Sequence, residues 1–193
     1  MTRCAWAKSD KDIIYHDEIW GEPLHDEQKL FAMLILEGQQ AGLSWSTILN
    51  KWDAFFIAYD NFDPNIVKDY DQDKIDELLS NAGIIRNRLK VNAAIKNSHA
   101  YLKLCQIHGS LNDYLWSKID YTPIINKYES MSEVPTSTEL SKKISLELKK
   151  LGFTFVGETI IYAYMQAIGM VNDHLVTCFK HPLYNSFHKK KDN

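Results

Sequence analysis

Apolar residues recur at helical spacing along most of the chain. Leu30, Phe31, Leu34 and Ile35 form one such stripe, and it follows Asp26, a residue type that commonly caps the start of a helix. Strict apolar–polar alternation between turn residues, which is typical of half-buried strands, is almost missing. The periodicity therefore predicts an all-α fold.

Caps and breaks divide the rest of the chain into further helices. Helices are expected at 44–59, from the Asp63-Pro64 pair onward, at 71–83, 86–104, 139–151 and 159–168. Between 119 and 138 the pattern is broken by Pro123 and Pro135, which indicates a long connection. Residues 152–157 join the last two helices by a short glycine-punctuated turn. The C-terminal part is thus predicted to be a helix, a tight hairpin and a second helix.

Length and composition favour one compact unit. The chain has 193 residues, of which 45% are hydrophobic, enough for a single core. We expect one unit over 1–183, with a helical core at about 26–170 closed by the two end segments 1–20 and 171–183. The lysine-rich end, 184–193, is expected to be a flexible tail.

Net charge and cysteine content limit the cellular compartments and the binding partners that we expect. A net charge of −3, from 22 basic and 25 acidic residues, gives no overall signature of nucleic-acid binding, so any DNA contact must come from local patches. Three widely spaced cysteines argue against a disulfide framework and leave metal binding or burial. With no apolar signal segment and no stretch long enough to span a bilayer, we expect a cytoplasmic protein without membrane contact.

Two Cys/His pairs near opposite ends of the chain form a candidate metal site. His174 and Cys178 stand four residues apart, on one face of an expected helix, and Cys4 and His16 supply the second pair. Together they make a Cys₂His₂ set that suits tetrahedral zinc, and four protein ligands leave no position open for activating water. On the residues alone, a buried free Cys178 and a hydrogen-bonded core His174 are the commoner arrangement.

Several sequence blocks, in order, resemble the bacterial 3-methyladenine DNA glycosylase I family. The most specific are LEGQQAGLSW at 36–45, NAGIIR at 81–86 and GFTFVG at 152–157, with RCAW at 3–6, YHDEIWG at 15–21 and VNDH at 171–174. The resemblance covers nearly the whole chain. It implies a helix-hairpin-helix fold whose two ends are joined by one structural zinc ion, held by Cys4, His16, His174 and Cys178.

The resemblance also implies an activity and a pocket. The expected enzyme is a monofunctional N-glycosyl hydrolase without lyase activity, which flips 3-methyladenine out of alkylated double-stranded DNA and leaves an abasic site. Glu37 would accept hydrogen bonds from the base, and Tyr15, Trp20 and Trp45 would form the pocket walls. For the two tryptophans, ordinary core packing is the alternative. Nothing in the sequence suggests an obligate dimer, so a monomer is expected.

DNA contacts are expected in two places. Gly42 and Leu43 are candidates for a wedge that enters a base step. In the hairpin, the backbone of Phe155, Val156 and Gly157, with the helix that starts near Thr159, would hold a DNA phosphate. Nearby lysines offer further phosphate contacts, although a solvated helix face explains them equally well: Lys142, Lys143, Lys149 and Lys150.

The resemblance places Asn172 where related glycosylases carry a catalytic aspartate. An amide cannot act as a general base, but a base methylated at N3 is cationic and departs as a neutral leaving group, so weaker activation of water suffices. Asp173 is then either a base or, more simply, a helix N-cap. One departure from the family is the segment 10–14, DKDII, where an aromatic residue is common.

Two other functions remain open on the sequence. A DNA-binding module could keep the hairpin and the metal site without removing a base. A zinc hydrolase unrelated to DNA would need a three-ligand site with an open position.

Overall fold

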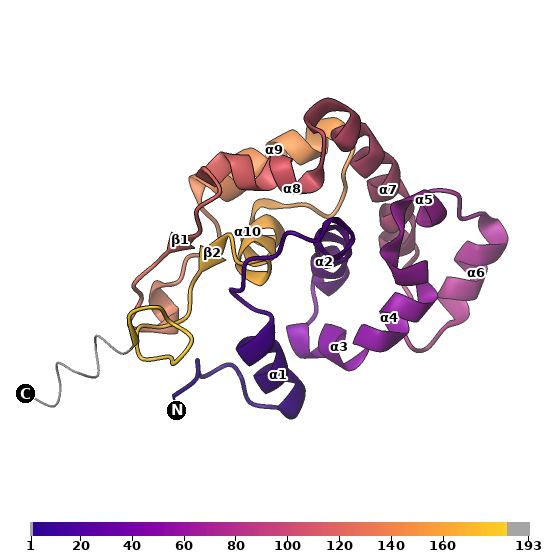
Figure 1. Cartoon of the computed structure of the whole chain (residues 1–193). Coiled ribbons are helices and arrows are strands. Elements are labelled where there is room, and N and C mark those ends of the chain that lie inside the picture. The colour runs from indigo at the N-terminus through magenta and orange to yellow at the C-terminus, as the bar shows by residue number, and fades with distance from the viewer. Residues whose placement is uncertain (1, 185–193) are drawn as a thin grey trace, which may run out of the picture.

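The computed structural model describes residues 2–184 and is built almost entirely of helices (Figure 1). In order, the α-helices are α1 (Asp10–Glu18), α2 (Glu27–Gln40), α3 (Trp45–Asn50), α4 (Trp52–Ala58), α5 (Pro64–Val67), α6 (Gln72–Ser80), α7 (Arg88–His108), α8 (Leu111–Trp116), α9 (Glu139–Leu151) and α10 (Glu158–Ala167). Short 3-10 helices cover Asp60–Phe62, Ser117–Ile119 and Met131–Glu133. The all-α prediction is confirmed. The tail predicted beyond 183 lies, apart from Tyr184, outside the described residues.

Side-chain caps explain where most of these helices begin. Each capping residue accepts a hydrogen bond from a backbone N–H in the first turn, which satisfies a donor that has no partner inside the helix. These residues are Ser9, Asp26, Ser44, Asp63, Asp71, Asn87, Ser110 and Thr138.

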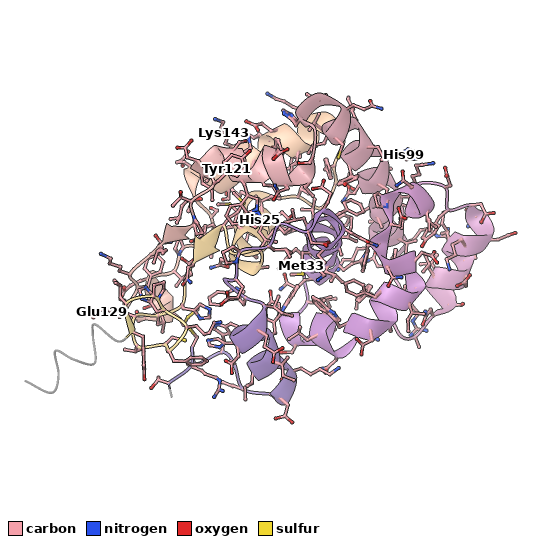
Figure 2. All side chains as sticks on the ribbon, viewed as in Figure 1. His25, Met33, His99, Tyr121, Glu129 and Lys143 are labelled. Atoms are coloured by element: carbon pink, nitrogen blue, oxygen red, sulfur yellow. The ribbon has the colours of Figure 1, made fainter. Side chains whose placement is uncertain are left out.

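Helix α2 runs through the centre of the molecule. It packs against α3 and α7 on one side and against α8 and α10 on the other. The sequence predicted an apolar stripe on one face, but every residue from Leu30 to Gln39 is buried, because helices cover α2 all round. Met33 lies in this central layer, only 3% exposed (Figure 2). The polar Glu37 is therefore carried into the interior of the protein.

The predicted helix 44–59 is two helices. Lys51 leaves helical geometry (φ −112°, ψ 8°) and separates α3 from α4. Its Nζ donates to the carbonyl of Ala82, so the break is held by a distant loop. Helices α1 and α8 were not predicted.

The two ends of the chain meet on one side of the molecule. The N–H of Phe179 donates to the carbonyl of Thr2 at 2.9 Å. Nearby, strand β1 (Ile124–Ile125) pairs in parallel with β2 (Val171–Asn172), with Ile124 opposite Val171. This pairing anchors the long connection 119–138 beside the C-terminal segment. None of the helices between residues 2 and 184 is both long and apolar enough to cross a membrane.

Candidate functional site

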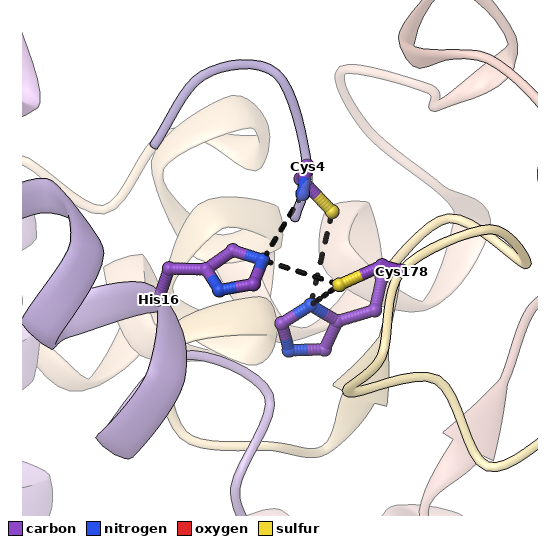
Figure 3. A group of neighbouring side chains, drawn as sticks. Cys4, His16 and Cys178 are labelled. Atoms are coloured by element: carbon purple, nitrogen blue, oxygen red, sulfur yellow. Dashed lines mark hydrogen bonds between the residues drawn. The ribbon is translucent and has the colours of Figure 1, made fainter. Parts of the chain in front are cut away.

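Four side chains from the two ends of the chain form a buried metal-binding group (Figure 3). Cys4 lies in the N-terminal loop, His16 in α1, and His174 and Cys178 in the loop after β2. The Cys178 sulfur is 3.4 Å from His16 Nε2 and 3.5 Å from His174 Nδ1, and the Cys4 sulfur is 3.8 Å from His174 Nδ1. Ligand atoms around a tetrahedral zinc are separated by about 3.3–3.8 Å, so the four residues fit such an ion.

Partners outside this group orient both imidazole rings. His16 Nδ1 donates to Asp17 at 2.7 Å, and His174 Nε2 donates to the carbonyl of Trp20 at 3.0 Å. The opposite nitrogen of each ring therefore faces the sulfur atoms, as is usual for metal-ligating histidines. Arg3 in turn binds Asp17 and, as the main cause, lowers the pKa of that carboxyl to about 2.

The two thiols influence each other's ionisation. Their mutual interaction raises the pKa of Cys4 and lowers that of Cys178. One thiolate is thus already favoured between two imidazoles, and thiolate is the form that binds metals. A site with four protein ligands is closed to substrate.

The predicted helix carrying His174 and Cys178 is wrong. Residues 173–180 form turns instead, held by hydrogen bonds from the N–H of Val176 to Tyr128 and from the N–H of Phe179 to Thr2. These contacts come from distant parts of the chain, so local spacing does not reveal them. The turn nevertheless directs both side chains at the same point.

A cavity of about 450 Å³ opens beside the metal-binding group. It contains the four predicted pocket residues, Tyr15, Trp20, Glu37 and Trp45. The other walls come from α1, α2, α3, α10 and the connection before α9: Trp6, Asp12, Gln40, Ser46, Met131, Val134, Pro135, Thr136, Thr159, Tyr162, Ala163 and Gln166. Within residues 2–184, no lysine, arginine or histidine lines it.

Two polar groups in the cavity are buried without a protein partner. Glu37 is 3% exposed, and desolvation raises the pKa of its carboxyl to about 8. No residue between 2 and 184 donates a hydrogen bond to that carboxyl. The indole N–H of Trp45 is also buried and unpaired. Because unpaired buried polar groups are costly, this pair points to a ligand with complementary polar edges.

Aromatic rings enclose these polar groups. The Tyr15 and Trp45 rings lie 5.2 Å apart, and the Trp6 and Trp20 rings meet edge to face at 5.1 Å. Trp20 also packs edge to face on His174 at 4.6 Å, so one ring borders both the cavity and the metal-binding group. Such walls suit a flat, aromatic ligand.

The segment predicted to act as a wedge, Gly42 and Leu43, lies next to the cavity. Gly42 has a φ of +76°, and Leu43 beside it is 38% exposed. The side chain of Gln40, which lines the cavity, donates to the Leu43 carbonyl at 2.9 Å. The wedge is therefore connected directly to the pocket.

In the hairpin, Phe155 occupies the left-handed region with a φ of 54°, a backbone conformation that favours glycine. Val156 is buried, so only its backbone is available, and Thr159 lines the cavity. Among the described residues, no acceptor pairs with the N–H groups of Val156, Gly157 and Glu158. Lys142 is paired with Glu139 on the exposed face of α9.

Asn172 and Asp173 both lie outside the cavity. The Asn172 carbonyl oxygen accepts the N–H of His174, which stabilises the turn at the metal-binding group. Asp173 is fully buried and accepts hydrogen bonds from Asn126, Tyr162 and Gln166. No helix begins at residues 174–183, so the N-cap prediction is wrong, and the three donors occupy the carboxylate oxygens that a base would need free.

Sequence reasoning missed several cavity residues. Trp6 was visible in the RCAW block but was not assigned a place in the pocket. Tyr162 and Gln166 stand four apart on α10, a spacing that puts both on one face, yet an apolar helix gave no reason to single them out. The connection that carries 131–136 is held beside the C-terminal segment by the β1–β2 pairing and by the hydrogen bond from Val176 to Tyr128, which no local pattern predicts.

Comparisons with known proteins agree with this geometry. The model of the methyladenine glycosylase family matches residues 6–181. A DNA-3-methyladenine glycosylase of Haemophilus influenzae is 45% identical over 178 residues, 92% of this chain and 96% of the relative. DNA-3-methyladenine glycosylase 1 of Escherichia coli is 45% identical over 183 residues, 94% of this chain and 98% of the relative.

A similar solved structure contains a bound base. It is a variant of 3-methyladenine DNA glycosylase I in complex with 3-methyladenine, 36% identical, with a TM-score of 0.90 over 94% of this chain and 98% of that one. The family match spans most of the chain, and the fold is the same. The chain belongs to the methyladenine glycosylase family.

Proposed function

We propose that this chain is a DNA repair glycosylase that excises 3-methyladenine from alkylated double-stranded DNA. The observation that carries the proposal is the aromatic cavity with two unpaired polar groups, the Glu37 carboxyl and the Trp45 indole N–H. An enzyme that acts on a base must take it out of the stack and hold its edge by hydrogen bonds between aromatic faces.

The pocket residues would divide the work. The rings of Tyr15, Trp20 and Trp45 take the flat faces of the base, and Glu37 binds its polar edge. A cationic base lowers the cost of ionising Glu37, because an opposite charge stabilises the carboxylate. Neutral adenine offers no such compensation, so discrimination follows from charge.

Hydrolysis without lyase activity fits the same cavity. A lyase step requires an amine nucleophile, and no lysine lines the cavity among residues 2–184. A base methylated at N3 leaves as a neutral molecule, so a water needs little activation once the base is oriented and desolvated.

The DNA itself would be held at the wedge and the hairpin. Leu43, exposed next to Gly42, is placed to enter the gap left by the flipped base. The free N–H groups of Val156 and Gly157, at the start of α10, are suited to a phosphate. Thr159, in the first turn of α10, lines the cavity and would link this phosphate site to the pocket.

The metal-binding group would hold one zinc ion with a structural role. Its two cysteines and two histidines are the ligands that zinc favours, and the four-ligand geometry leaves no place for substrate. Bound there, zinc supplies a crosslink between the two ends of the chain. The protein would act as a cytoplasmic monomer, with the unit spanning 1–183.

Base release from methylated duplex DNA tests the function. Wild-type protein should liberate 3-methyladenine, identified by chromatography, and Glu37→Ala should release it about 10- to 100-fold more slowly, because a buried hydrogen bond to a charged group is lost. Glu18→Ala, an exposed acidic position on α1, is the matched control. Folded wild-type protein that frees no base would leave a DNA-binding module as the better explanation.

A further inference from the structure

A second carboxylate, that of Asp12, lines the cavity. Asp12 lies in the first turn of α1. Its Oδ2 accepts the N–H of Ser9 at 3.1 Å, and its Oδ1 accepts the hydroxyl of Ser46 at 3.0 Å. The side chain is thus fixed between α1 and α3, in the wall of the pocket.

The two carboxyls of the cavity differ in ionisation. Burial acts to raise the pKa of Asp12, but hydrogen bonds from Ser9 and Ser46 outweigh it and hold that pKa below its usual value. Burial without such partners raises the pKa of Glu37 to about 8. At neutral pH the empty cavity therefore contains an ionised Asp12 and a protonated Glu37.

No basic side chain offsets this charge at the cavity wall in the described part of the chain. The remaining walls are aromatic, aliphatic or neutral polar residues, so water screens the charge weakly. A fixed negative charge opposes the approach of DNA phosphates. In the cavity wall, the same charge favours the binding of a positively charged ligand inside the cavity.

We infer that Asp12 is a specificity-determining residue, which supplies the standing negative charge of the pocket and favours a cationic base over a neutral base of the same shape. The inference rests on the proposed function for its natural ligand, a purine made cationic by alkylation. Asp12 would act before Glu37 does, because it is charged in the empty pocket. Glu37 then adds its own charge as the cation arrives.

Two small ligands of similar shape, one cationic and one neutral, separate the effect of charge on binding from the effect of shape. The 3,9-dimethyladeninium ion is cationic, and 3-deaza-3,9-dimethyladenine keeps both methyl groups and is neutral when its pyridine-type nitrogen is unprotonated, so both ligands are compared at about pH 8. The affinity of each is measured by quenching of tryptophan fluorescence, with Trp45 and Trp20 in the cavity wall as reporters. Wild-type protein should bind the cation about tenfold or more tightly than its neutral counterpart.

Asp12→Asn removes the charge and keeps the shape. Its amide oxygen still accepts from Ser9, and its NH₂ donates to the Ser46 hydroxyl. This variant should lose most of the preference for the cation, about tenfold, and bind the neutral ligand as wild type does. Asp10→Asn, an exposed position on the same helix, makes the same charge change outside the cavity and should retain the preference.

A second uncharged variant guards against misfolding. Asp12→Ser places a hydroxyl where the capping box of α9 has Ser141, so the start of α1 is preserved. If both uncharged variants fold and still prefer the cation as wild type does, the inference is overturned. Failure of the proposed function is separate: it would appear as no base release from DNA, whatever the small-ligand preference.

Discussion

Burial of Glu37 lowers the stability of the folded protein. It sits on the most buried helix, 3% exposed, with aromatic rings around it and no donor reaching its carboxyl in residues 2–184. A buried acid without a partner destabilises the folded state at every pH at which it would otherwise ionise. Its presence in the pocket is explained by a ligand that completes its hydrogen bonds.

The raised pKa of Glu37 predicts how stability changes with pH. The carboxyl titrates near 4.5 when exposed and at about 8 when folded, so between these values the folded state retains a proton that the unfolded state has released. Folding stability should therefore fall as pH rises from 5 to 8, by up to about 1.4 kcal/mol per pH unit from this group. Glu37→Gln lacks this dependence.

Urea unfolding of both proteins at pH 5, 6, 7 and 8 measures the effect. The free energy of unfolding of Glu37→Gln, relative to wild type, should increase steadily across this range and level off above it. Glu18→Gln, an exposed change on α1, should show a constant difference. Parallel pH curves for wild type and Glu37→Gln would mean that the acid is ionised in the folded protein.

The sequence blocks that resemble the family identified single residues that lie in the cavity. The pocket residues Tyr15, Trp20, Glu37 and Trp45 do meet in one cavity, although the resemblance supplied their grouping. Asp173 was placed wrongly, because its three partners come from α10 and the connection near β1. A local sequence pattern does not show which hydrogen-bond donors surround a carboxylate in the folded protein.

At the scale of elements, Lys90 ties α7 to the end of α2. It is only 6% exposed, and its Nζ donates to the carbonyls of Gln39 and Ala41, each at 2.7 Å. A cation at the C-terminus of a helix pairs with carbonyls that have no partner inside the helix. Gly42 and Leu43, the proposed wedge, follow Ala41 in the sequence. Lys90 therefore also holds the residue at which the proposed wedge begins.

Lys90→Met should therefore loosen the wedge and destabilise the protein. The methionine fills similar space but leaves two carbonyls unpaired, which costs about 2–4 kcal/mol. Urea unfolding gives the stability, and hydrogen exchange of residues 41–47 reports the local opening. Lys96→Met, at an exposed position of the same helix, is the control; equal behaviour of the two variants would show that Lys90 is not a cap.

Element boundaries were predictable where a cap sits beside an apolar run. Asp26 starts α2 as expected, and the helices predicted from residues 71 and 139 begin with the caps Asp71 and Thr138. The break at Lys51 was not predicted; the hydrogen bond that its side chain makes there reaches a carbonyl 31 residues away, which no local pattern reveals. Short polar helices such as α1 also escape a method based on apolar spacing.

At the scale of the whole molecule, the metal-binding group joins the ends of the chain. Cys4 and Cys178 approach across nearly the full sequence, and the Thr2–Phe179 hydrogen bond lies beside them. A crosslink that closes so long a loop restricts the unfolded chain strongly. The ion would thus contribute to global stability and to the cavity wall through Trp20.

Cys178→Ser should lower both metal content and stability. A serine hydroxyl is a poor zinc ligand, so we expect loss of the ion and about 2–5 kcal/mol of stability. Elemental analysis by mass spectrometry and thermal unfolding measure the two effects. Cys105→Ser changes a thiol remote from the group and should keep its metal; full metal occupancy in Cys178→Ser would refute a role for this thiol as a ligand.

The position of Cys178 also has a consequence during synthesis. Most of the helices can leave the ribosome and pack before the last two proposed ligands, His174 and Cys178, have been synthesised. A chain that terminates early would therefore lack half of the proposed ion's donors, and its N-terminal segment would stay open to proteases. Capture of the proposed ion would thus require that translation has passed Cys178.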